Sequence, residues 1–212
     1  MNNARVVGGL TAALGAVVLL AAGATPVRAQ TPFEPSFEVD GRLGLAVPFG
    51  GIGKLEDIGL AANLGGAYWF SPRLAVRGDW GLEALSGSSI PAAQSFRSLN
   101  LWHYTVGLET NLAPPISGNV KFTVNGGLGL TTLDFSGSGP THTYFSLTGG
   151  ARLLFPISPE VDLFGGAQLN LAFTKGGDLY QRLDGSPDLQ PLGTSSAWTL
   201  PLWGGIQVHF PY

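Results

Sequence analysis

The stretch FEVDGRLGLAV, residues 37–47, alternates in character from one residue to the next. Its odd positions carry apolar side chains such as Phe37 and Leu45, whereas its even positions include Glu38, Asp40 and Arg42. Successive side chains of a β-strand point to opposite faces. The alternation therefore predicts a strand with one apolar face and one charged face.

The same alternation recurs in seven further runs, over residues 58–70, 74–84, 102–112, 120–130, 145–155, 161–173 and 198–210. Across the eight runs the apolar face carries no charge, while the opposite face carries ten charged residues. These ten residues are Glu38, Asp40, Arg42, Arg77, Asp79, Glu83, Glu109, Lys121, Arg152 and Asp162. Each run spans 11–13 residues. A strand of a soluble protein usually has about 5–6 residues, whereas a tilted strand that crosses a bilayer needs about 9–11.

The connections between the runs alternate between tight turns and longer loops. Turns are predicted at residues 71–73, 114–119 and 157–160, and loops at 48–57, 86–98, 136–142 and 175–197. Short turns on one side and longer loops on the other are typical of transmembrane barrels. Because hydrocarbon offers the backbone no hydrogen-bond partner, strands that span it must close on themselves. We therefore predict an all-β fold, an eight-stranded antiparallel up-and-down transmembrane β-barrel, with both chain ends on the short-turn side.

The first 29 residues differ from the rest of the chain. Arg5 precedes an apolar run over residues 6–23, and Val27 and Ala29 occupy the two positions that a signal peptidase reads. We predict a cleaved signal peptide at residues 1–29 and a barrel domain at residues 30–212. A retained membrane anchor is the alternative interpretation of the same segment.

Composition and charge exclude several classes of function. Charged residues make up 12% of the chain, about half of the usual share of roughly 25%. Without residues 1–29, nine basic and fourteen acidic residues remain, a net charge of −5. This argues against a nucleic-acid partner, which requires a basic face. The chain has no Cys, which excludes disulfides and thiolate metal sites. We predict no cofactor and no metal site.

The interior of an eight-stranded barrel is just filled by side chains. The ten charged residues would meet there, four of them cationic and six anionic. Since an unpaired buried charge is costly, we expect them to form a structural ionic network that fills the lumen. A narrow, porin-like channel is the alternative.

With these eight runs, the chain resembles the small eight-stranded outer-membrane barrels, the OmpA transmembrane domain and OmpX among them, over residues 33–212. The C-terminal run GIQVHF, residues 205–210, resembles the signal that the outer-membrane assembly machinery reads. The resemblance assigns that signal to Ile206, Val208, Phe210 and Tyr212. It implies a Gram-negative outer membrane, contact with membrane lipid and lipopolysaccharide, and periplasmic termini. It also implies a role in envelope integrity, adhesion or binding through the loops.

Two further functions are weighed against this structural or surface-interaction role. His103, Thr105 and Glu109 share a face and supply the parts of a nucleophilic triad, and residues 103–105 faintly resemble the His-x-Ser of barrel-borne lipid A deacylases. Thr stands in place of Ser, and these side chains point to the lumen, so we predict that the protein is not an enzyme. The other alternative is a soluble lipocalin-like calyx, in which the apolar rows would face inward.

Overall fold

The computed structural model describes residues 33–211, except for 55, 88, 91–93, 96–97, 113–119, 136–140, 175–179, 183–188 and 192–195. The predicted signal peptide at residues 1–29 lies outside the described residues, as does Tyr212. Among the described residues, no helix combines the length and the apolar character needed to cross a membrane.

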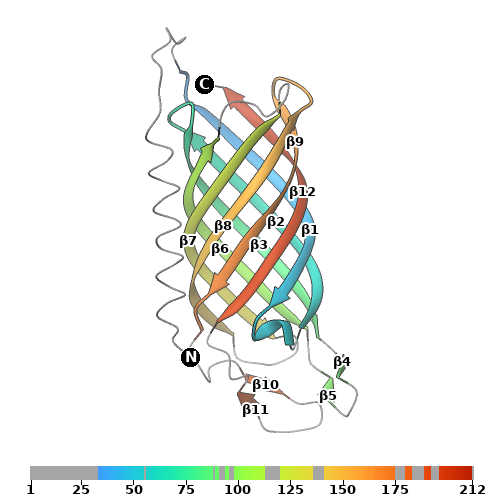
Figure 1. Cartoon of the computed structure of the whole chain (residues 1–212). Helices are drawn as coiled ribbons and strands as arrows, with labels where there is room; N and C mark the ends of the chain where they lie inside the picture. The colour runs from blue at the N-terminus through green and yellow to red at the C-terminus, as the bar shows by residue number, and fades with distance from the viewer. Residues whose placement is uncertain are drawn as a thin grey trace. The chain divides into compact units, whose positions relative to one another are not determined.

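Eight long strands form the fold. They are β1 (Ser36–Phe49), β2 (Glu56–Trp69), β3 (Leu74–Gly87), β6 (Leu99–Asn111), β7 (Lys121–Phe135), β8 (His142–Pro156), β9 (Val161–Ala172) and β12 (Ala197–Pro211). Each pairs antiparallel with its neighbours in the chain, and β1 pairs with β12 to close the barrel (Figure 1). The predicted all-β, eight-stranded, up-and-down barrel is thereby confirmed.

Most strands are longer than the apolar runs from which they were predicted, although β9 ends one residue before its run does. Residues 48–49 pair with residues 198–199, so β1 continues to Phe49 and the first loop shrinks from the predicted 48–57 to 50–55. Backbone hydrogen bonds between strands do not require alternating side chains. A strand can therefore extend beyond the alternating pattern from which it is predicted. The 3-10 helix η1 (Ile52–Lys54) occupies this loop. Gly50 precedes it with a φ of 69°, a conformation that glycine adopts at no steric cost.

Two predicted loops contain short hairpins that the pattern did not indicate. β4 (Ser89–Ile90) pairs with β5 (Gln94–Ser95) between β3 and β6, and β10 (Tyr180–Arg182) pairs with β11 (Leu189–Pro191) between β9 and β12. Strands of two or three residues are too short to show a period of two. Both hairpins lie at the end of the barrel that also carries η1, which we call the long-loop end (Figure 1).

Tight turns close the opposite, short-turn end. The Ser71 hydroxyl accepts a hydrogen bond from the backbone N–H of Leu74 at 2.9 Å. The backbone N–H of Ile157 donates to the carbonyl of Val161 at 2.9 Å. The third predicted turn, 114–119, lies outside the described residues.

The alternation of side chains agrees with the barrel wall. In β2, Leu60 and Leu64 are 69% and 55% exposed on the outer face, whereas Ala61 and Asn63 between them are 3% and 7% exposed. The other strands show the same parity. The apolar rows therefore form the outer surface, and the charged rows point into the lumen.

Candidate functional site

The lumen is the part of the structure where charged side chains gather. We call six of them the central cluster, and they come from β1, β3, β6 and β8. The central cluster consists of Asp40, Arg42, Arg77, Asp79, Glu109 and Arg152. With three guanidinium groups and three carboxylates it is formally neutral.

Arg77 lies at the centre of these ion pairs. Its Nη1 donates to Glu109 Oε2 at 3.0 Å and its Nε to Asp79 Oδ1 at 3.0 Å, and its Nη2 also binds Asp40. Arg42 Nε donates to Asp40 Oδ1 at 2.6 Å, and its Nη2 pairs with Asp79. Because Asp40 and Asp79 each meet both of these guanidinium groups, the charges of β1 and β3 compensate one another, and Glu109 links them to β6.

Arg152 completes the central cluster and links it to uncharged neighbours. Its Nη2 binds Glu109, and its Nη1 donates to Gln207 Oε1 at 3.1 Å. Its guanidinium lies 5.1 Å from the ring centre of Phe164, and that of Arg42 lies 5.1 Å from Trp203. Such cation–π contacts add to the ion pairs when the groups are desolvated.

No role was predicted from the sequence for Phe164, Trp203 or Gln207. All three are buried and fall on the inward parity of β9 and β12. Their position on the inward parity could have identified them, because a large aromatic side chain on the charged face of a strand has to lie beside the charges. The predicted ionic network rests on the charges of this face and does not include its aromatic residues.

One glycine makes room for the central cluster. A Cβ atom at Gly65 would collide with the guanidinium of Arg77 and lie 2.6 Å from Arg42 Nη2 and from Asp79 Oδ1. The inward side of β2 at this height is therefore left open for side chains from β1 and β3.

A second group, at the short-turn end, combines four titratable side chains. His209 lies between two carboxylates, with Nδ1 2.8 Å from Glu38 Oε1 and Nε2 2.9 Å from Asp162 Oδ2. Lys121 Nζ is 3.4 Å from the same Asp162 oxygen. The structure thus places Glu38, Lys121 and Asp162 together, apart from the ion pairs of the central cluster. His209 was not among the predicted site residues, although its inward parity was visible in the sequence.

Towards the long-loop end the lumen first carries a polar group and then becomes apolar. Glu83 Oε1 accepts a hydrogen bond from Asn170 Nδ2 at 2.5 Å and lies 3.0 Å from His103 Nε2. Beyond it, five aliphatic side chains fill the interior, each at most 1% exposed. They are Ile52, Leu85, Leu99, Leu101 and Leu133. Ile52 belongs to η1, so the loop between β1 and β2 contributes to closing this end.

This apolar layer differs from the expectation of a polar lumen throughout its length. The predicted runs end where the alternation of apolar and charged residues ends. The strands continue beyond these points, and Leu99, Leu101 and Leu133 face the lumen there. Beyond the charged rows, at the end of the barrel, both faces of a strand can be apolar. The sequence then does not alternate, and it cannot predict which side chains face the lumen.

The residues weighed as a nucleophilic triad are not brought together. His103 Nδ1 lies 2.9 Å from Thr131 Oγ1 and its Nε2 faces Glu83, whereas Glu109 binds Arg77 and Arg152. His103 and Glu109 therefore belong to separate groups of contacts. In the described part of the chain, no group of three or more His, Cys, Asp or Glu side chains has the geometry to hold a metal ion.

Replacing His103 with Ala is expected to leave lipid A unchanged, because its hydrogen-bonding and ion-pair contacts are side chains of the lumen. The test compares the lipid A of cells that express the wild type and the H103A variant by mass spectrometry, with barrel folding verified in both. An acylation difference that depends on His103 would contradict this expectation.

Three of the residues assigned to an assembly signal lie on the outer face of β12. Ile206, Val208 and Phe210 pair with Gly41, Val39 and Phe37 of β1. The ring centres of Phe37 and Phe210 are 6.4 Å apart. The fourth residue of the set, Tyr212, lies outside the described residues. Three of the four thus lie at the seam where the last strand meets the first.

A closed barrel of eight antiparallel strands, apolar outside and charged inside, is the architecture of the small outer-membrane barrels. Solved structures agree with that class. Neisserial surface protein A aligns with 82% of this chain and 97% of its own, at 16% identity and a TM-score of 0.58. The outer-membrane protein OprG from Pseudomonas aeruginosa aligns with 84% of this chain and 96% of its own, at 10% identity and a TM-score of 0.56.

At these identities the likeness establishes the fold, and the predicted resemblance to small eight-stranded outer-membrane barrels is confirmed at that level. No family model matches the chain, and no curated protein matches it.

Proposed function

We propose that this protein is an integral outer-membrane barrel with a lumen closed by its own side chains, acting as a structural or surface-interaction protein. In this role the barrel anchors the loops of the long-loop end outside the cell, for envelope integrity, adhesion or loop-mediated binding. It takes no part in catalysis and needs no cofactor.

The observation that carries this proposal is the inverted distribution of polarity. Leu43 on the outer face is 72% exposed, whereas Asp40, Arg42, Arg77, Glu109 and Arg152 inside are at most 3% exposed. The surface of a soluble domain is about 25–35% charged residues. An outer surface of aliphatic and aromatic side chains suits hydrocarbon instead, and the ion pairs inside remove the cost of unpaired buried charge.

The same distribution argues against the calyx alternative. A soluble lipocalin-like calyx requires the apolar rows to line its cavity, and here they lie outside. The narrow-channel alternative requires water around the interior charges. The near-complete burial of Asp40, Arg42, Arg77, Glu109 and Arg152 supports a filled lumen instead, because solvent hardly reaches them.

The location and partners in this proposal follow from the membrane setting. Lipid and lipopolysaccharide would contact the outer face, and the assembly machinery would read Ile206, Val208, Phe210 and Tyr212 during biogenesis. β1 begins and β12 ends at the short-turn end, which supports a periplasmic position for both.

Membrane insertion and conductance test the proposal on one sample. We expect the protein in the outer-membrane fraction, with a gel mobility that changes on heating because the closed barrel resists detergent when cold. The same sample should give no stable unitary current in a planar phosphatidylcholine bilayer. Recovery in the soluble fraction would refute the membrane assignment. Steady ion-selective currents would refute the filled lumen and support the narrow channel.

A further inference from the structure

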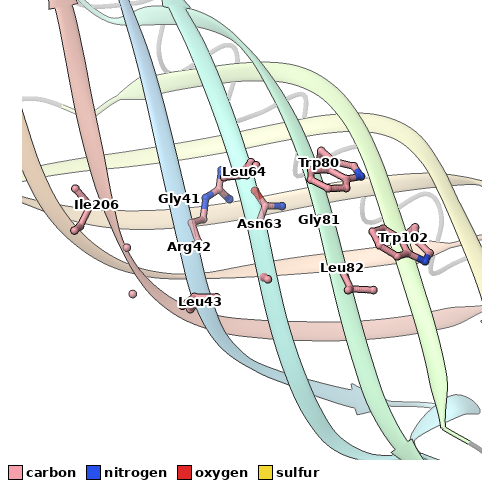
Figure 2. A pocket seen from close by; sticks show the side chains of 13 residues that line it. Gly41, Arg42, Leu43, Asn63, Leu64, Trp80, Gly81, Leu82, Trp102 and Ile206 are labelled. Carbon is pink, nitrogen blue, oxygen red and sulfur yellow. The ribbon is translucent and has the colours of Figure 1, made fainter.

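The outer face of the barrel carries a groove with a cavity volume of about 620 Å³. It crosses five strands, from β12 over β1, β2 and β3 to β6 (Figure 2). The outward-facing residues of its lining include Gly41, Leu43, Leu64, Trp80 and Ile206. The groove therefore lies in the apolar surface of the barrel and is separate from the lumen.

The register of the strands explains the shape of this groove. One row of paired residues runs through Gly204, Leu43 and Ala62, and the next row runs through Ile206, Gly41 and Leu64. Small residues alternate with large ones in both rows, so the glycines and the alanine form a floor between aliphatic walls. A Cβ atom at Gly41 would have only Leu64 Cδ2 within 4 Å, at 3.8 Å. The floor is open rather than packed.

The chemistry of the groove is uniformly apolar. Two indoles border it on β3 and β6, where Trp80 and Trp102 stack with their ring centres 5.9 Å apart and an interplanar angle of 19°. Arg42 and Asn63 belong to the same stretch of wall but are buried on the lumen side. An occupant of this groove meets hydrocarbon and aromatic surface and no charge.

Size and surroundings decide what kind of molecule fits. Cavities that bind small molecules have volumes of about 300–1,000 Å³, and this groove lies within that range. A stable dimer buries about 1,200–2,000 Å², far more surface than a groove of this size presents. The groove is continuous with the apolar outer band that, in the proposed function, contacts the bilayer.

We propose that the groove holds one acyl chain of a membrane lipid, retained longer than the lipids on the rest of the barrel surface. This inference rests on the proposed function, since the outer face has to contact lipid. The rows of small residues seat the chain across the strands, and the stacked indoles cover one end of it. The bound molecule is therefore an acyl lipid, whatever its head group.

The test uses the full barrel reconstituted in vesicles of palmitoyl-oleoyl-phosphatidylcholine, extracted into detergent and measured by native mass spectrometry. We expect one phosphatidylcholine retained per barrel. The variants Gly41→Leu and Ala62→Leu fill the floor of the groove and should each lower retention about tenfold, since a Leu side chain removes many of the van der Waals contacts between the bound chain and the floor. Gly149→Leu is the matched control. Gly149 also faces outward, on β8 and outside the groove, with only a carbonyl 3.9 Å from a Cβ at that position.

Heat-dependent gel mobility of every variant establishes that the barrel is folded and inserted. An inserted wild-type barrel without lipid would overturn the acyl-chain site and leave the membrane assignment intact. Equal retention in the wild type and both groove variants, or equal loss in Gly149→Leu, would also overturn it. A mass of two barrels that disappears in Gly41→Leu would assign the groove to a second copy instead. Failure to insert would refute the proposed function and this inference with it.

Discussion

Gly65→Leu is expected to lower the free energy of unfolding by about 3–5 kcal/mol, the usual cost of breaking a buried ion pair. Its side chain would occupy the space that the guanidinium groups of Arg77 and Arg42 now fill. These groups cannot swing aside cheaply, because each is held by two or more carboxylates from different strands. The measurement is urea unfolding in phosphatidylcholine vesicles, followed by the loss of the fast-migrating folded band.

Gly66→Leu is the control for this prediction, one residue along the same strand. Gly66 faces outward, and a Cβ atom there would lie 3.5 Å from Phe37 Cζ, an ordinary contact distance. We expect a change within about 0.5 kcal/mol, as for most surface substitutions. Equal effects of the two substitutions would mean that the central cluster can rearrange around a larger side chain.

The period of two in the sequence predicts which way each side chain faces, and the pairs of the central cluster show where that information ends. Parity places Asp40, Arg77 and Arg152 inside, but it gives no height along the barrel axis. Asp40 of β1 contacts Arg77 of β3 and Arg152 of β8, which lie 37 and 112 residues away in the chain. Such contacts depend on the strand tilt and on the register of every intervening pair, quantities set by closure.

Loops are predicted less well than the barrel wall, for a different physical reason. Ile52 is fully buried although it lies in a predicted loop, because η1 folds it onto the interior leucines. A single apolar side chain between glycines carries no periodic signal. The apolar packing in the lumen at the long-loop end therefore cannot be predicted from the sequence pattern. It depends on the assembled strands and on the position of the first loop.

Arg77→Met is expected to lower the free energy of unfolding by about 3–5 kcal/mol, as measured for buried pairs that lose one partner. Arg77 binds Asp40, Asp79 and Glu109, and its loss leaves three carboxylates facing two guanidinium groups. Arg73→Met, at an exposed position of the turn between β2 and β3, is the control and should change stability by no more than about 0.5 kcal/mol. The measurement is the same urea titration in vesicles.

The loss of stability in Arg77→Met can come from unbalanced charge or from lost packing. A second substitution in the Arg77→Met variant distinguishes the two causes. Glu109→Gln restores equal numbers of acids and bases in the central cluster, with Arg42 and Arg152 facing Asp40 and Asp79, and it keeps an oxygen that accepts from Arg152. If uncompensated charge causes the loss, the double variant R77M/E109Q should regain about half of it, although E109Q alone is destabilising. Coupling of this size, about 1–3 kcal/mol, is typical of residues in one network. Additive losses would instead show that Arg77 stabilises the barrel through its volume, because an extra buried carboxylate would then carry no measurable cost.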